Sequence, residues 1–98
     1  MAYEIILKKR FLNKVDKVLR YLEKEWSKKV ARDFLLKIDR RIEQLTHQPE
    51  IGSPSERIPN VRGLVITLHN KMYYKISGNK IIVLNMYDTR MNPGKNPY

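Results

Sequence analysis

Residues 61–90 read VRGLVITLHNKMYYKISGNKIIVLNMYDTR, and this stretch decides the fold. It contains three runs rich in β-branched and aromatic side chains, which favour strands. The runs cover residues 61–68, 72–76 and 81–87. His69-Asn70 separates the first two runs and Ser77-Gly78-Asn79 the next two, and both sequences suit hairpin turns because Gly and Asn tolerate positive φ. The stretch therefore predicts a three-stranded antiparallel meander.

Two amphipathic helices are expected before the meander. Apolar residues recur at three- and four-residue steps, which is the period of a helix with one buried face. The first face consists of Phe11, Val15, Val18, Leu22 and Trp26, and the second of Val30, Phe34, Leu35, Ile38, Ile42 and Leu45. Ser27 is a natural N-cap for the second helix, and Pro49 and Gly52 end it. Because the connection is so short, the helices should form an antiparallel hairpin.

The remaining segments complete the expected architecture. Residues 3–7, YEIIL, predict a further strand that must pair within the same sheet, and the proline-rich residues 49–59 predict a loop. The order is thus β-α-α-β-β-β, an α+β fold with a helical hairpin packed on one face of an antiparallel sheet. A single domain covers residues 1–98, with residues 91–98 as a C-terminal tail. The opposite face of the sheet is left open for a ligand.

The composition indicates a small basic protein with an anionic partner. Lys and Arg number 20 against 10 Asp and Glu, which gives a net charge of +10 over 98 residues. Such a charge attracts nucleic acid, ribosomal RNA included, and an acidic protein would satisfy the same field. No apolar run approaches the ~20 residues that cross a bilayer, and no secretory leader is recognisable. We therefore expect no membrane partner and a cytoplasmic location.

The residue types leave little room for metal or cofactor chemistry. The chain has no cysteine and only two histidines, too few ligands for a structural metal site, so no metal and no cofactor are expected. The four glycines are scattered singly and form no phosphate-cradling loop. Asp88 is the only acid after Glu56, so the C-terminal half cannot supply a carboxylate pair for acid–base catalysis.

Basic and aromatic side chains alternate through the C-terminal half. They are Arg57, Arg62, Lys71, Lys75, Lys80, Arg90 and Lys95, with Tyr73, Tyr74, Tyr87 and Tyr98 between them. Such a surface suits RNA, because cations hold phosphates and rings stack on bases, although tyrosines also serve simple strand packing. If Arg57, Arg62 and Arg90 converge, they could stabilise a pentacoordinate phosphate without a metal, with a Tyr or His moving the proton. Alternatively, Arg62 protects an edge strand from aggregation.

An ordered set of short motifs resembles the RelE/ParE-type toxins over nearly the whole chain. In the helical region the set comprises residues 21–27, YLEKEWS, followed by Ala31, Phe34-Leu35, Ile38-Asp39, Ile42, Leu45, Pro49 and Gly52. In the strands it comprises Val61-Arg62-Gly63-Leu64, residues 69–76 (HNKMYYKI) and Asp88-Thr89-Arg90-Met91-Asn92-Pro93. The resemblance implies a β-α-α-β-β-β toxin of a type II toxin–antitoxin module.

The first reading of the sequence is the RelE-like branch, in which the resemblance implies an mRNA interferase, an endoribonuclease that cuts mRNA on the ribosome without a metal. The 2′-hydroxyl there attacks the adjacent phosphate. By position, Arg62 and Arg90 match the arginines that carry this phosphate, and Tyr87 or Tyr98 would transfer the proton. The nucleic acid would be held by Arg57, His69, Lys71 and Lys95.

In the ParE-like branch, the resemblance implies a DNA gyrase inhibitor with no hydrolytic site. The Trp26-Ser27 junction and the Pro49…Gly52 loop look more like this branch. A third reading is a non-toxic binding module of the same fold. All three readings imply a cognate antitoxin whose acidic or amphipathic segment wraps the chain, so the sequence leaves open whether the protein is an enzyme.

Overall fold

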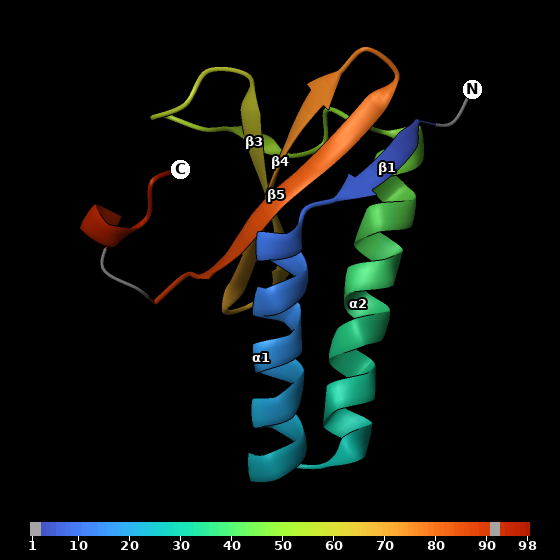
Figure 1. Ribbon diagram of the computed structural model, residues 1–98, viewed down its shortest axis with the longest axis vertical. Helices are drawn as coiled ribbons and strands as arrows, with labels where there is room; N and C mark the ends of the chain where they lie inside the picture. The colour runs from blue at the N-terminus through green and yellow to red at the C-terminus, as the bar shows by residue number, and fades with distance from the viewer. Residues whose placement is uncertain (1–2, 91–92) are drawn as a thin grey trace.

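A computed structural model describes residues 3–90 and 93–98, and it confirms the expected α+β order (Figure 1). The elements are β1 (Glu4–Leu7), α1 (Lys9–Glu25), α2 (Lys28–His47), β2 (Ser53–Pro54), β3 (Val61–Thr67), β4 (Asn70–Ser77), β5 (Lys80–Asp88) and a short 3-10 helix, η1 (Pro93–Lys95). The expected tail falls partly on residues 91 and 92, which lie outside the described residues. None of the described helices is long and apolar enough to cross a membrane.

The five strands form one sheet in the order β1-β5-β4-β3-β2. The meander of β3, β4 and β5 is antiparallel, as expected, with its turns at residues 68–69 and 78–79. The first strand differs from the wholly antiparallel expectation, because β1 runs parallel to β5 with Ile5 beside Ile81. β1 lies at the edge of the sheet beside β5 and runs in the same direction as β5. The sheet is therefore mixed rather than wholly antiparallel.

The loop expected over residues 49–59 contributes a short edge to the sheet. Ser53 and Pro54 pair with Gly63 and Arg62 to form β2. Proline is tolerated at such an edge because its missing N–H removes no bond from the sheet interior. β2 therefore forms the edge of the sheet beside Arg62 and Gly63. Over the rest of its length, β3 is itself the edge strand.

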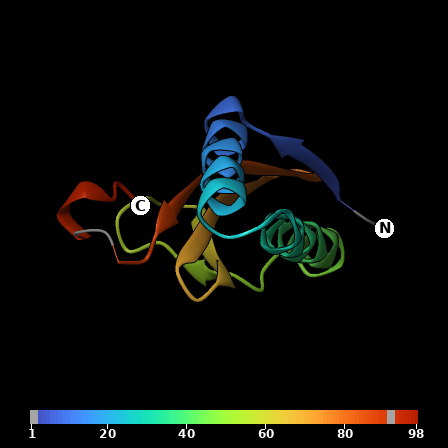
Figure 2. The ribbon, with the colours of Figure 1, turned by 90° about the horizontal axis from the view of Figure 1, so that it is seen from below.

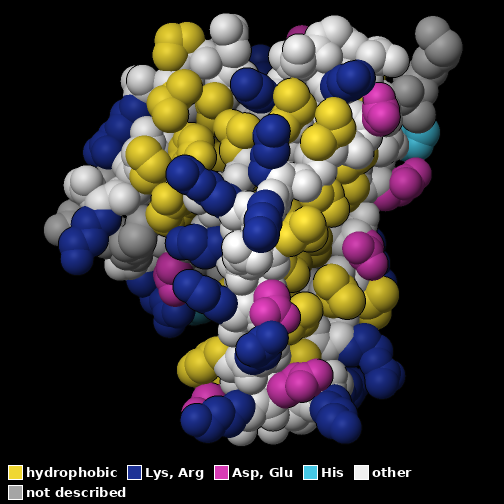
Figure 3. All heavy atoms as spheres, viewed as in Figure 1, with side chains coloured by type: hydrophobic (Ala, Val, Ile, Leu, Met, Phe, Trp, Pro, Cys, Tyr) yellow, Lys and Arg dark blue, Asp and Glu magenta, His cyan; other side chains and the backbone are white. Residues whose placement is uncertain are grey.

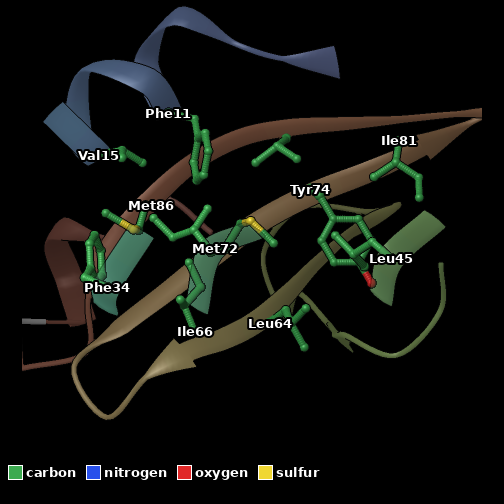
Figure 4. Packing of buried hydrophobic residues seen from close by; sticks show 12 residues of the cluster. Phe11, Val15, Phe34, Leu45, Leu64, Ile66, Met72, Tyr74, Ile81 and Met86 are labelled. Carbon is green, nitrogen blue, oxygen red and sulfur yellow. The ribbon is translucent and has the colours of Figure 1, made fainter. Parts of the chain in front are cut away.

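The core lies between the helical hairpin and one face of the sheet (Figures 2 and 4). The helices supply Phe11, Val15, Phe34, Ile38 and Leu45, and the sheet supplies Leu64, Ile66, Met72, Tyr74, Ile81, Val83 and Met86. The sheet residues share one face because side chains alternate along a strand and paired residues point the same way. Burial of this face against two amphipathic helices is the main source of stability.

A bulge in β5 decides which side chains reach each face. Tyr73 pairs with Asn85 while the next residue, Tyr74, pairs with Val83, so Leu84 is an extra residue. The bulge lets Val83 and Met86 both face the helices although they are three residues apart. As a result, Tyr87 points to the open face with Tyr73, a placement that a one-residue register change would reverse.

The far end of the hairpin extends past the sheet (Figure 1). Trp26 is 70% exposed and Val30 and Leu35 are also exposed, although the periodicity predicts all three on buried faces. The sheet does not reach Trp26 and Val30, so the apolar stripe there has no strand to cover it. Leu35 directly follows the buried Phe34, so its exposure reflects its position at the side of the buried stripe of α2. The helix boundary itself is confirmed: the Ser27 side chain caps α2 by accepting a hydrogen bond from Val30 N at 3.1 Å.

Candidate functional site

Three tyrosine rings gather on the open face of the sheet, and we call Tyr73, Tyr87 and Tyr98 the aromatic cluster. The Tyr98 ring stacks on Tyr73 with centroids 4.8 Å apart, and it lies 5.8 Å from Tyr87. Tyr73 and Tyr87 meet edge to face at 6.3 Å. These spacings are those of favourable aromatic pairs. The structure therefore brings the two tyrosines expected at the site, Tyr87 and Tyr98, into one cluster.

The C-terminal tail is held on this face by polar contacts. The Asn96 side chain donates to the Tyr73 hydroxyl at 3.0 Å and accepts from Tyr98 N at 2.9 Å. Arg57 Nη1 donates to the Asn96 carbonyl oxygen, and the Ser55 hydroxyl donates to the carbonyl oxygen of Tyr98. Both views of the ribbon show the tail lying beside the loop that precedes β3 (Figures 1 and 2). Hydrogen bonds thus join the tail residues 96–98 to residues 55–57.

A cavity of about 320 Å³ opens next to the tail. It is lined by Ser53, Pro54, Ser55, Glu56, Arg57, Gly63, Lys71, Tyr73, Asn96 and Tyr98. Gly63 lets the side chains of Lys71 and Tyr73 lie against the β3 backbone in this lining, because a Cβ at that position would lie 2.5 Å from Lys71 Cε and 3.0 Å from the Tyr73 ring. The cavity combines two cations, one side-chain carboxylate and two tyrosine rings, and such a lining suits a polar segment with an aromatic side chain.

Cations surround the aromatic cluster. Lys14 Nζ lies 4.4 Å from the centre of the Tyr87 ring, and Lys71 Nζ lies 5.7 Å from that of Tyr73. Both distances are within the range of cation–π attraction. Lys95 is exposed on the tail nearby. Figure 3 shows Lys and Arg side chains continuing along α1, so the basic surface extends beyond the sheet.

Arg62 lies apart from this cluster. It pairs with Tyr74 across β3 and β4 and alternates in phase with Leu64, so it points to the helix side of the sheet. There, Arg62 Nη1 donates to the carbonyl oxygen of Gly52 at 2.8 Å and to that of Glu50 at 3.4 Å. Its guanidinium thus holds the loop after α2 in place.

Tyr74 holds the same loop from inside the core. Its hydroxyl donates to the Pro49 carbonyl oxygen at 2.7 Å and accepts from Gly52 N at 3.0 Å. Burial raises the pKa of the Tyr74 hydroxyl above its ordinary value of 10.0, more than the Gly52 hydrogen bond lowers it. The hydroxyl therefore stays protonated at neutral pH and serves as a structural donor.

Arg90 lies at the opposite end of the sheet and is paired with Asp88. Arg90 Nη2 contacts Asp88 Oδ2 at 2.7 Å and Nε contacts Oδ1 at 3.0 Å, a two-pronged arrangement. The hydrogen bonds from Arg90 lower the pKa of Asp88 from 3.8 to about 2, and the same pairing raises that of Arg90. The structure therefore does not bring Arg57, Arg62 and Arg90 together.

His69 and Arg90 line a second hollow, which we call the hairpin groove, of about 890 Å³. Its lining consists of Lys17, Val18, Tyr21, Leu22, Trp26, Val30, Asp33, Phe34, Lys37, Thr67, His69, Asn70, Asp88 and Arg90. The floor is apolar and the rim carries charges of both signs. His69 itself lies in the β3–β4 turn, where its backbone N–H bonds the Thr67 hydroxyl and its carbonyl accepts from Thr89 N.

Several residues of the two sites are absent from the sequence-based set. Ser55 and Asn96 anchor the tail, Lys14 comes from a helix, and Trp26 lines the groove. The Asn96-Pro97-Tyr98 ending could have indicated a turn beside the tyrosine, but nothing local ties it to Ser55. Within residues 3–90 and 93–98, no three His, Cys, Asp or Glu side chains are grouped to hold a metal ion.

Solved structures of other proteins share this fold. The chain has a fold similar to the chromosomal ParDE toxin–antitoxin system of P. aeruginosa, with a TM-score of 0.76 at 17% identity, covering 89% of this chain and 96% of that one. It is also similar to the RelBE2 toxin–antitoxin complex of Mycobacterium tuberculosis (TM-score 0.64, 11% identity, 90% and 99% covered). A YoeB/ParE toxin from Agrobacterium tumefaciens gives 0.65 at 13% identity, with 87% and 97% covered.

Sequence comparison narrows the assignment. No curated protein sequence matches the chain significantly. The family model described as the ParE toxin of the type II toxin–antitoxin system, parDE, matches residues 5–93, which span every helix and strand from β1 to β5. The chain therefore belongs to the ParE toxin family of type II toxin–antitoxin systems.

Proposed function

We propose that the chain arrests growth by binding DNA gyrase, as the ParE-like branch implies, and that it does not cut RNA. The observation that carries this proposal is the separation of Arg62 from Arg90. Each guanidinium already has a partner, the loop backbone for Arg62 and the Asp88 carboxylate for Arg90. The nuclease reading places Arg62 and Arg90 around one phosphate, and in this arrangement both are engaged elsewhere.

Distance supports the same conclusion. Arg62 pairs with Tyr74, whereas Asp88, two residues before Arg90, pairs with Asn70 at the other end of β4. Four residues of strand span roughly 13 Å at ~3.3 Å per residue. Metal-free phosphoryl transfer needs its cations and its proton-transferring group in contact with one phosphate. Arg62 and Arg90 cannot share one phosphate in this arrangement.

The decisive experiment adds the purified chain to DNA gyrase in a supercoiling assay. We expect loss of supercoiling with the wild-type chain and equal loss with the Arg62→Gln and Arg90→Gln variants, once folding is verified. A matched assay with topoisomerase I controls for DNA masking by a basic protein. Unimpaired gyrase at a large molar excess of chain would overturn the proposal.

The aromatic cluster favours a second candidate, ribosome-dependent mRNA cleavage. Arg57 and Lys71 flank three tyrosine rings on the open face, an arrangement that suits stacked bases and phosphates. Primer extension on mRNA from a purified translation system separates the two candidates. New 5′ ends that appear only with translating ribosomes, and that disappear with Tyr87→Phe, would establish the nuclease. Intact message together with normal growth on expression would instead indicate the non-toxic module.

We further propose a cognate antitoxin as the chain's partner, with an amphipathic acidic segment in the hairpin groove. The P. aeruginosa and M. tuberculosis structures are described as toxin–antitoxin assemblies. In this chain the lining of the groove combines apolar side chains with Lys17, Lys37 and Asp33, besides the paired Arg90 and Asp88. The apolar side chains suit the apolar face of a helix, and the small excess of cations suits acidic residues on its other face.

A further inference from the structure

We infer that the place occupied by Tyr98 is an exchangeable peptide-binding site whose resident ligand is the chain's own tail. We call it the tail seat and define it by Ser55, Arg57 and Tyr73. A partner's extended segment carrying an aromatic ring would bind there by replacing residues 96–98. This inference is independent of the toxin's target, because it concerns what the seat holds and not what the toxin inhibits.

The seat is organised by contacts that do not involve the tail. The Ser55 hydroxyl accepts from Arg57 N and Ile58 N, both at 3.1 Å, and Ser55 N donates to the Val61 carbonyl oxygen at 2.7 Å. Tyr73 is fixed in the central strand β4, paired with Gly63 on one side and Asn85 on the other. Departure of the tail would therefore leave a preformed site, which lowers the cost of binding a replacement.

The contacts to the tail are of a kind that another peptide can repeat. Arg57 donates to the carbonyl oxygen of Asn96, a backbone group that every peptide offers, and Ser55 donates to the main-chain oxygen of Tyr98. Selectivity comes from the ring stacked on Tyr73 and from the Asn96 amide, which donates to the Tyr73 hydroxyl. Backbone recognition with one or two side-chain pockets is how proteins receive extended segments of varied sequence.

The chemistry of the seat favours a peptide over a nucleic acid. A base could stack on Tyr73, and Lys71 could meet a phosphate, but the Glu56 carboxylate lines the same cavity and repels phosphate. The Arg57 guanidinium, the cation engaged by the tail, meets the neutral carbonyl oxygen of Asn96. We therefore assign the seat to a polypeptide and make nucleic acid binding an outcome of the test.

Tethering explains why the tail is the resident ligand. A segment attached by a short connection acts at an effective concentration on the order of millimolar. A free peptide must exceed that concentration, or the tail's own contacts must be weakened, before exchange occurs. The full-length chain with Asn96→Ala and Tyr98→Ala removes the amide contact and the ring stack while leaving the seat intact. Lys95→Ala is the matched control, because Lys95 is exposed on the same tail.

The test is a titration of these ¹⁵N-labelled chains with an acetylated peptide of sequence PGKNPY, followed by NMR. We expect the amide signals of Ser55, Arg57 and Gly63 to shift and saturate in the Asn96→Ala/Tyr98→Ala chain at a peptide concentration at least about tenfold lower than in the wild-type and Lys95→Ala chains. The peptide PGKNPA should shift none of them. Adding Arg57→Gln, an exposed change that spares the fold, should weaken binding severalfold.

Three results would overturn the inference. They are no saturable shift in the Asn96→Ala/Tyr98→Ala chain, equal response in the wild-type chain, or saturation by hexathymidylate but not by PGKNPY. The last result would assign the seat to single-stranded nucleic acid instead. None of these readouts depends on gyrase or mRNA, so failure here and failure of the proposed function are distinguishable.

Discussion

The guanidinium of Arg62 donates hydrogen bonds to backbone carbonyl oxygens. Its bond to the Gly52 carbonyl at 2.8 Å fixes the loop that joins α2 to the sheet. The alternation of β3 contained the signal for this placement, because Arg62 is in phase with the buried Leu64 and Ile66. An arginine aligned with core residues at the end of a strand reaches back to nearby carbonyls more readily than to a ligand on the other face.

We expect Arg62→Ala to act on stability and to leave toxicity intact. Loss of a charged hydrogen bond to backbone costs about 1–2 kcal/mol of unfolding free energy. Chemical denaturation measures this change, and Arg41→Ala is the control, because Arg41 makes one exposed bond to Gln44 on α2. Abolished toxicity in a fully stable Arg62→Ala chain would restore the catalytic role.

The Arg90–Asp88 pair predicts a specific pH response. The pKa of Asp88 is lowered from 3.8 to about 2, so its carboxylate is stabilised in the folded state. The stabilisation is fully present above about pH 4 and is lost as the pH falls toward 2. An NMR titration of the Asp88 carboxyl group should show the low midpoint in the wild-type chain and a midpoint raised toward 3.8 in Arg90→Ala, which removes the side-chain bonds but keeps the backbone hydrogen bond from residue 90. The same midpoint in the wild-type and Arg90→Ala chains would contradict the pairing.

Gly52 is required by the close approach of Tyr74. A Cβ at residue 52 would lie 2.7 Å from the Tyr74 hydroxyl and 2.9 Å from the Gly63 carbonyl oxygen. We expect Gly52→Ala to lower the unfolding free energy by about 1–3 kcal/mol, as overpacking does. Gly78→Ala is the comparison, since nothing lies within 4 Å there and only its φ of +61° is strained, at roughly 1–2 kcal/mol. Thermal melts of both variants measure the cost of the steric clash at residue 52 and of the positive φ at residue 78. A Gly52→Ala chain with the wild-type melting temperature would exclude the clash.

At the scale of elements, the helices and the meander could be predicted from the sequence because their signals are local. The helical period, the Ser27 cap and the Gly78-Asn79 turn each act within a few residues. The partner of β1 and the bulge at Leu84 could not, because strand pairing across the chain leaves no periodic trace. The same reason hides the candidate site: the contact between Ser55 and Tyr98 joins two loops far apart in the sequence.

The cap of α2 gives a test at this scale. Removing the bond from Val30 N to the Ser27 hydroxyl should cost about 1 kcal/mol. We expect this loss in Ser27→Ala and near wild-type stability in Ser27→Asp, because aspartate also caps. Equal denaturation midpoints for the Ala and Asp variants would show that the cap adds nothing to the hairpin.

On the scale of the whole molecule, Trp26 reports on the hairpin groove. It is the chain's single tryptophan and is 70% exposed, so its emission should be that of an indole in water. Docking of the proposed antitoxin over the groove would bury the ring and shift the emission to shorter wavelength. The measurement is fluorescence of the purified pair, with Trp26→Phe as the blank. A verified complex with unshifted emission would place the antitoxin elsewhere.

The parallel pairing of β1 with β5 has a consequence for how the chain is made. Its strand β1 is made before both helices but has no partner until residues 80–83 have also been made. Such long-range pairings close late and slowly. The helical hairpin can form while the chain grows, whereas the sheet cannot take in β1 before β5 has been made. A product cut short before residue 80 would lack β5 and leave β1 without its partner, so no such fragment could complete the sheet.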